Sequence, residues 1–159
     1  MFDTFFLAVD FKVSWKQATV DPSLIGKAKE LEVASILVRN GLYVFFPLVD
    51  AGVDLVVTNR ASRHFIPVQV KYRASDPALG LTKQDIARFH DTETVVAFII
   101  GTSPEQRTWF VPFRDWEAMS VDLNRADERV YVTISRNEAK LAQFAGDEGA
   151  RMAFASLLK

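Results

Sequence analysis

Several kinds of feature are missing from this sequence of 159 residues. It contains no cysteine, which excludes disulfides, thiolate catalysis and zinc sites built on sulfur, and which fits a reducing cytoplasm. No apolar run approaches the roughly 20 residues that a membrane span needs. The N-terminal stretch is interrupted by Asp3 and Asp10, and it lacks the basic region and cleavage site of a signal peptide. We therefore expect a cytoplasmic protein without a membrane partner.

An excess of charge of one sign is also missing, because the formal net charge is −1. A strong non-specific DNA binder is usually basic, so any nucleic-acid surface must be a local patch. The hydrophobic content of 49% and the charged content of 25% are those of an ordinary globular chain. The length and the absence of a linker predict one domain, residues 1–159, with one core.

The hydrophobic pattern predicts helices alternating with strands. Asp21-Pro22-Ser23 marks the start of a first helix, and Gly41 marks its end. Thr82 begins a second helix, in a capping box that Asp85 completes. The expected helices are 24–40, 82–90, 114–119 and most of 136–158 with breaks near Gly146 and Gly149, and the expected strands are 43–48, 53–58, 65–72, 95–100, 109–113 and 130–134. This order predicts an α/β fold, with a mixed sheet covered by helices on both faces.

The first helix carries an acid where an apolar residue is expected. At 100° per residue, Glu30 shares its side of the helix with Leu31, Val33, Ala34, Leu37 and Val38. The other side carries Lys29, Glu32, Ser35 and Arg39. A carboxylate that faces a core needs a cation, a metal or strong donors. The alternative is a frayed or rotated first turn that lets Glu30 reach water.

Two strands carry further polar residues. In Gly52-Val53-Asp54-Leu55, an acid stands at the start of an apolar strand, where it either serves a site or caps the preceding turn. In the strand at 65–72, Gln69 and Lys71 share one face, and the opposite face is apolar. If this face of the strand is open to solvent, the two polar side chains need no protein partner. If helices cover both faces of the sheet, each needs a hydrogen-bond or ion-pair partner. Glu30 and Asp54 are the candidates for that partnership.

The order of these residues, an acid on a helix, then Asp, then polar-x-Lys, resembles the PD-(D/E)XK nuclease superfamily. Within it, the sequence resembles in particular the branch of archaeal Holliday-junction resolvases, and it is also similar to homing endonucleases with Gln at the second acidic position. The segments GKAKELEVASILVRNG, AGVDLVV and PVQVKY look like the motif helix and the two motif strands. The resemblance covers roughly residues 24–100, and leaves an N-terminal arm (1–22) and extra strands and C-terminal helices (101–159) outside it.

The resemblance implies a three-layer α/β/α fold of the restriction-endonuclease type and a metal-dependent DNA endonuclease, with structured or branched DNA as the candidate substrate. It makes Glu30, Asp54, Gln69 and Lys71 the catalytic residues. Asp54, Gln69 and Glu30 would be ligands of Mg²⁺, with Mn²⁺ as a substitute, and no small-molecule cofactor is expected. Lys71 would lie beside the attacking water, and its alternative is an ion pair with Asp54.

The chain departs from the family pattern at two positions. Val53 stands where Pro is common, and Gln69 stands where the family has an acid, which removes a charge from the metal site. Some relatives with Gln at this position are active, whereas others with substitutions there are silent. A silent domain that binds nucleic acid or a protein partner is therefore the alternative function, and a small interaction module with a buried Glu30–Lys71 ion pair is a third. Pro67 cannot donate to the strand ladder, so pairing there should be one-sided or should begin after it.

Other residues could serve partners. The basic residues expected to contact DNA phosphates are Lys27, Arg60, Arg63, Arg73 and Lys83, and half of such loop charges are expected to be merely solvated. His64 and His90 have no metal-ligand spacing, and no catalytic role is assigned to them. Large apolar patches rarely stay open on monomers, so the aromatic residues of the N-terminal arm suggest a homodimer: Phe2, Phe5, Phe6, Phe11 and Trp15.

Overall fold

A computed structural model describes residues 21–49, 52–76, 78–121 and 128–158. The predicted contact aromatics of the N-terminal arm lie outside the described residues. The helices are α1 (Pro22–Arg39), α2 (Lys83–Phe89), α3 (Phe113–Met119), α4 (Glu138–Leu141) and α5 (Gly146–Ala153), with a 3₁₀ turn at Ala142–Phe144. The strands are β1 (Tyr43–Phe45), β2 (Leu55–Thr58), β3 (Phe65–Arg73), β4 (Ala78–Thr82), β5 (Val95–Ile100), β6 (Arg107–Pro112) and β7 (Arg129–Thr133).

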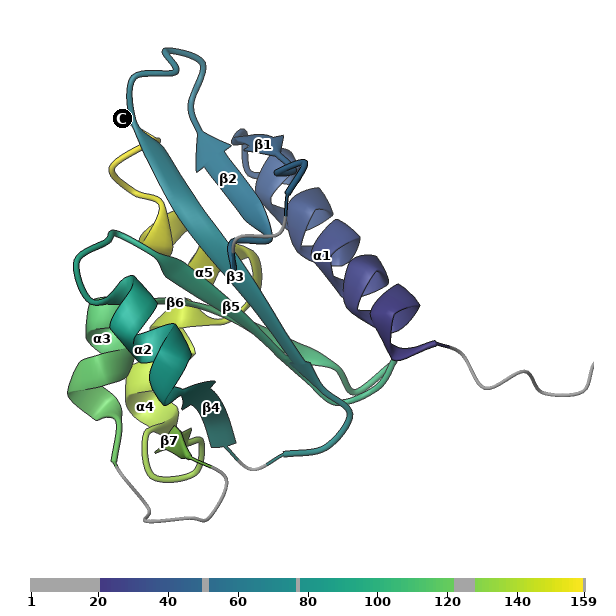
Figure 1. Cartoon of the computed structure of the whole chain (residues 1–159), viewed down its shortest axis with the longest axis vertical. Helices are drawn as coiled ribbons and strands as arrows, with labels where there is room; N and C mark the ends of the chain where they lie inside the picture. The colour runs from purple at the N-terminus through teal and green to yellow at the C-terminus, as the bar shows by residue number, and fades with distance from the viewer. Residues whose placement is uncertain (1–20, 50–51, 77, 122–127, 159) are drawn as a thin grey trace, which may run out of the picture.

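A five-stranded mixed sheet in the order β1-β2-β3-β5-β6 forms the centre, and β4 pairs with β7 in a separate two-stranded sheet (Figure 1). β3 and β5 are parallel, because α2 crosses between them, and the other pairs are antiparallel. The predicted class, a mixed sheet with helices on both faces, is confirmed.

Strand β3 changes partners along its length. β2 pairs with Phe65–Val68, and β5 pairs with Val68–Arg73. Pro67 stands opposite Val56 of β2, before the pairing with β5 begins, so the one-sided pairing expected at this proline is present. The second half of β3 therefore extends past the end of β2 (Figure 1).

Two hydrophobic clusters cover the two faces of the central sheet. The first packs Val33 and Leu37 of α1 and Ala150 of α5 against Val68 and Ile99 of the sheet. The second lies on the other face, where α2, α3 and the β4–β7 pair cover the central strands. The covering elements contribute Phe89, Phe113, Leu79 and Val132, and β5 contributes Val96 and Phe98. Strand β5 contributes to both clusters, as its continuous apolar run predicted.

Several boundaries differ from the expected ones for physical reasons. β1 ends at Phe45 rather than at residue 48, because Pro47 lacks a backbone donor. The last helical region is divided at Gly146, which has a φ of +57°, but Gly149 lies inside α5 and does not break it. A Cβ at Gly149 would lie 1.9 Å from the carbonyl oxygen of Phe144, so glycine is needed there for close backbone packing.

Strand β4 was not predicted, because it is only five residues long and contains Gly80. Among the described residues, no helix is long and apolar enough to cross a membrane.

Candidate active site

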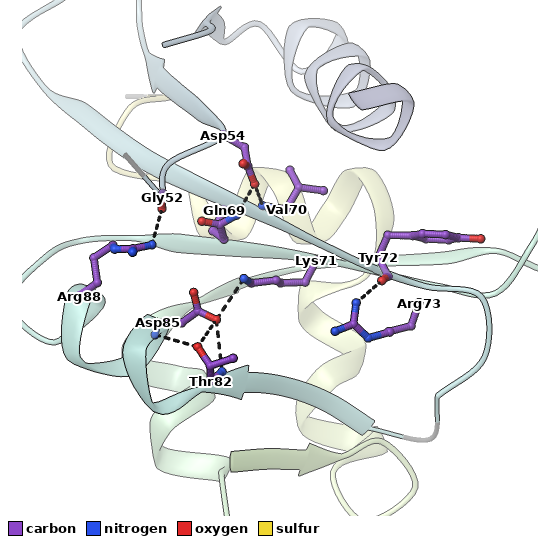
Figure 2. A network of polar contacts seen from close by, with 10 residues as sticks. All are labelled: Gly52, Asp54, Gln69, Val70, Lys71, Tyr72, Arg73, Thr82, Asp85 and Arg88. Atoms are coloured by element: carbon purple, nitrogen blue, oxygen red, sulfur yellow. Dashed lines mark hydrogen bonds and ion pairs between the residues drawn. The ribbon is translucent and has the colours of Figure 1, made fainter. Parts of the chain in front are cut away.

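Asp54 lies just before β2, at the point where β2 separates from β3. Its backbone N–H donates to the carbonyl of Val68, 3.0 Å away. Its side-chain Oδ2 accepts a hydrogen bond from the backbone N–H of Val70 at 2.6 Å (Figure 2). The carboxylate thus occupies the position that a paired strand would take, which explains why β2 begins at Leu55 rather than at the expected Val53.

Gln69 is brought to Asp54 as the sequence suggested. Its side chain is buried, and its Nε2 donates to the same Oδ2 of Asp54. The amide nitrogen therefore faces the carboxylate, and the amide oxygen points elsewhere. A half-turn of the amide exchanges the two atoms, since the oxygen and the nitrogen occupy equivalent positions on its plane.

Lys71 forms an ion pair with a residue that the sequence did not suggest as its partner. Its Nζ lies 3.0 Å from Oδ2 of Asp85, the third residue of α2, and Figure 2 shows the two side chains turned toward each other. The sequence suggested Glu30 or Asp54 as the ion-pair partner of Lys71, but in the structure the partner is Asp85. Strand pleating explains why Glu30 is not the partner, because Val68, Val70 and Tyr72 face α1 and the side chains of Gln69 and Lys71 point away from it.

Asp85 is held from several sides. Its Oδ2 accepts hydrogen bonds from Thr82 N at 3.2 Å and from Thr82 Oγ1 at 2.9 Å, in the predicted capping box. Burial acts to raise the pKa of Asp85, but the hydrogen bond and the charge of Lys71 and the bonds from Thr82 outweigh it. The pKa of Asp85 is consequently held below its ordinary value, and the carboxylate is charged at neutral pH.

Glu30 lies on the other side of the sheet. It shares its helix face with the buried residues Val33, Ala34 and Leu37, as predicted, and only 13% of its side chain is exposed. Lys27, one turn earlier, forms an ion pair with it. α1 begins at Pro22, so Glu30 is inside a regular helix and not in a frayed turn.

The apolar side of α1 is narrower than the sequence indicated, because Leu31 and Val38 are more than half exposed. Lys29, expected on the solvent side, is instead largely covered. Its Nζ lies 5.1 Å from the ring centre of Tyr72 in β3 and donates to Glu32 at 2.8 Å. A lysine can cover an apolar surface with its stem and still keep its charge paired.

The candidate DNA-binding residues do not form one group. Arg73 follows Lys71 in β3 and Lys83 begins α2, so both are close to the Lys71–Asp85 pair. Arg60 and Arg63 are exposed in the β2–β3 turn, at the opposite end of this hairpin from Asp54. At about 3.3 Å per residue, Arg60 is about 20 Å along the chain from Asp54. Lys27 lies near Glu30 on α1.

Two residues of α2 were missed as members of this region. Asp85 contacts Lys71, and Arg88 donates to the carbonyl of Gly52 at 3.4 Å (Figure 2). Gly52 has a φ of +79°, and a Cβ there would lie 1.6 Å from a guanidinium nitrogen of Arg88. One feature of the sequence could have indicated Asp85. A lysine such as Lys71, if it points into a sheet face that a helix covers, requires a carboxylate from that helix.

The donor atoms match a hard cation in type but are few. Asp54 and Gln69 provide oxygen atoms, which Mg²⁺ prefers, and Mg²⁺ retains waters in place of further protein ligands. Within the described ranges, no group of three or more His, Cys, Asp or Glu side chains could hold a metal ion. The residues present therefore fit a site with one carboxylate and one amide, completed by water.

Comparison with known proteins supports the fold. The sequence matches no family model and no curated protein. The structure is similar to that of Hjc, a Holliday junction resolvase from the archaeal hyperthermophile Archaeoglobus fulgidus, with a TM-score of 0.50 and 20% identity. The similarity covers 70% of this chain and 85% of the resolvase. At the level of the fold, the resemblance predicted from the sequence is confirmed: this chain has the restriction-endonuclease-like α/β fold of an archaeal resolvase.

Proposed function

We propose that this protein is a metal-dependent endonuclease that hydrolyses phosphodiester bonds of DNA, with branched or structured DNA as its substrate. The observation that carries the proposal is the meeting of Asp54 and Gln69 where β3 leaves β2, with Lys71 two residues further along the same strand face. The fold shared with a Holliday junction resolvase supports the choice of branched DNA.

Asp54, Gln69 and the backbone carbonyl of Val70 would hold the cation. Val70 N–H points to Asp54, and the carbonyl of the same residue points to the same edge of β3. Glu30 approaches from the α1 side of the sheet, so after release from Lys27 it would contribute through water rather than directly. A bound Mg²⁺ or Mn²⁺ would supply charge neutralisation at the phosphate and a more acidic water.

The chain's own residues would do the remaining work. The Val70 N–H holds the Asp54 carboxylate in place. Gln69, whose amide nitrogen faces Asp54 in this structure, would turn its amide to present the oxygen. Lys71 presents a positive charge on the α2 side of β3, where it would orient the attacking water and stabilise the negative charge that develops on the phosphate. Arg73 and Lys83 would contact neighbouring phosphates, and these contacts add affinity without sequence information. Lys27, Arg60 and Arg63 would contact more distant parts of a bound DNA.

The test is cleavage of duplex, single-stranded and four-way branched DNA with Mg²⁺ or Mn²⁺. We expect cleavage of branched DNA, and its loss in Asp54→Ala and in Lys71→Ala while folding is retained. Protein that leaves all three DNAs intact with either metal would contradict the proposal.

A silent nuclease-like domain that binds DNA or a protein is the second candidate. It is favoured by the amide at Gln69 and by the engagement of Glu30 with Lys27. DNA binding in the presence of a chelator, without cleavage when metal is added, would support it. The third possibility was a small interaction module with a buried Glu30–Lys71 ion pair. The structure does not support it, because Lys71 pairs with Asp85.

We also propose that the protein acts as a single domain and as a homodimer. α1 exposes Leu24, Leu31 and Val38 at intervals of seven residues, and β1 exposes Tyr43 and Phe45. Exposed apolar groups of this size are typical of contacts between subunits. Light scattering of the wild type and of Leu31→Glu tests the dimer, which the variant should weaken. The cytoplasmic location remains a prediction.

A further inference from the structure

The ion pair between Lys71 and Asp85 leads to an inference about α2 that rests on the proposed function. We propose that Asp85 is a positioning residue, which fixes where the ammonium group of Lys71 lies relative to Asp54 and Gln69. Helix α2 would then be a structural part of the site, and the two motif strands alone would not place the lysine.

The first step of the argument is the stiffness of Asp85. Thr82 donates to its carboxylate twice, and the Asp85 N–H donates back to Thr82 Oγ1 at 3.0 Å. Asp85 is only 6% exposed. A short side chain held by a capping box and by burial has one available position, so it is suited to fix a flexible partner.

The second step is the freedom that Lys71 would have without it. A lysine side chain has four rotatable bonds and a compact charge that does not by itself select a direction. About a quarter of the Lys71 side chain is exposed, so water could hold its charge in many positions. The 3.0 Å contact with Asp85 selects one of them.

The third step is the attachment of α2 to the rest of the site. Thr82, the N-cap of α2, is paired with Arg129 of β7. Arg88, one turn after Asp85, donates to Gly52, two residues before Asp54. Helix α2 therefore contacts β3 at Lys71 and the segment before β2 at Gly52, so Asp85 holds Lys71 in a fixed position relative to Asp54.

Chemical labelling of lysines tests this inference without relying on cleavage. Amine acetylation of the full-length protein, mapped by mass spectrometry, reports the labelling rate of Lys71, and exposed Lys83 serves as an internal reference. Asp85→Asn keeps an oxygen for the Thr82 cap and removes the charge. We expect Lys71 to label about tenfold faster in this variant, because a charge-assisted hydrogen bond is lost.

Matched variants separate positioning from folding and from general charge. Asp76 lines the same small hollow as Lys71, so Asp76→Asn removes an equal charge close by and should leave the Lys71 rate unchanged. Asp85→Glu keeps the charge and should label like the wild type. Thr82→Ala loosens the cap but keeps the Asp85 carboxylate, so Lys71 should label at a rate between those of the wild type and Asp85→Asn.

Cleavage kinetics then connect the position of Lys71 to the reaction. If the wild type cuts DNA, Asp85→Asn should lower kcat about tenfold with KM unchanged. An unchanged labelling rate in Asp85→Asn would overturn the inference, as would unchanged kcat in an active enzyme. If the wild type cuts no DNA, the proposed function fails separately, and the labelling rates still decide whether Asp85 positions Lys71.

Discussion

The two faces of the central sheet differ in what they bury. Under α1 and α5 the buried side chains are apolar, from Val33 and Leu37 to Phe154. Under α2 the sheet buries Gln69, and the covering helix buries Asp85. The α1 face therefore stabilises the fold by burial of apolar side chains. The α2 face also buries polar groups, which destabilise the fold unless they are hydrogen-bonded or ion-paired. The α2 face thus combines an apolar cluster of its own with the paired polar groups of the proposed site.

The largest expected effect comes from the apolar face. Leu37→Ala removes a fully buried side chain from α1 and should lower the free energy of unfolding by about 2–5 kcal/mol. Ser35→Ala, in the same helix but at an exposed position outside the proposed dimer surface, should change it by less than about 0.5 kcal/mol. Urea unfolding at constant protein concentration measures both. Equal losses would mean that α1 packs by a different face.

The next effect concerns Gln69 on the polar face. Gln69→Glu replaces a donor that bonds Asp54 with a second carboxylate, so in chelator the melting temperature should fall by an amount equivalent to about 1–3 kcal/mol. A charge about 4 Å from a cation contributes roughly 4 kcal/mol per unit charge before desolvation. Mg²⁺ affinity should rise about tenfold if only about 1.4 kcal/mol of it remains.

Calorimetric titration and melts in chelator check these two results, with Gln106→Glu as a control. Gln106 is an amide that bonds Lys29 and Glu32, away from Asp54. Unchanged Mg²⁺ affinity together with an unchanged melt would mean that Gln69 does not face a cation site.

A smaller effect is expected from the cap of α2. Thr82→Ala removes the hydroxyl that accepts from Asp85 N–H, and loss of such a cap costs about 1 kcal/mol. Thr82→Ser keeps the hydroxyl and should retain most of this stability. Thermal unfolding of the three proteins is the measurement, and an alanine variant as stable as the wild type would show that the cap is not needed.

The smallest effect depends on pH. The pKa of Asp85 is lower in the folded chain than its ordinary value of 3.8, so its ionisation contributes stability above pH 3.8, which is lost as the pH falls through the folded pKa. Asp85→Asn should therefore lose less stability than the wild type below about pH 4. Asp115→Asn, which changes an exposed acid in α3, is the matched control. Parallel acid-unfolding curves for the wild type and Asp85→Asn would contradict the assignment.

The sequence predicted what local pattern determines. The apolar run at 95–100 indicated a strand covered on both faces, and Thr82 with Asp85 indicated the cap of α2. The position of Glu30 among buried residues also followed from helical periodicity. These features depend on neighbours within a few residues.

What the sequence could not predict depends on contacts between distant segments. Asp85, the partner of Lys71, lies 14 residues later in the chain. The sequence indicated only its role in the cap of α2, because residue spacing alone does not show which face of a strand a helix covers. Arg60 and Arg63 are close to Asp54 in the sequence, yet the hairpin separates them from it. Strand β4 is recognisable only through its pairing with β7.

The bond from Val70 N–H to Asp54 also has a consequence for self-association. Beyond Val68, no described strand pairs with the β2 side of β3, so this backbone is an open edge, and open edges recruit strands from other molecules. The partly buried carboxylate of Asp54 accepts a hydrogen bond from the Val70 N–H at this edge, and its negative charge repels the carbonyl oxygen of an incoming strand. An Asp54→Ala protein should therefore associate through this strand edge more readily than the wild type, in addition to lacking a proposed metal ligand.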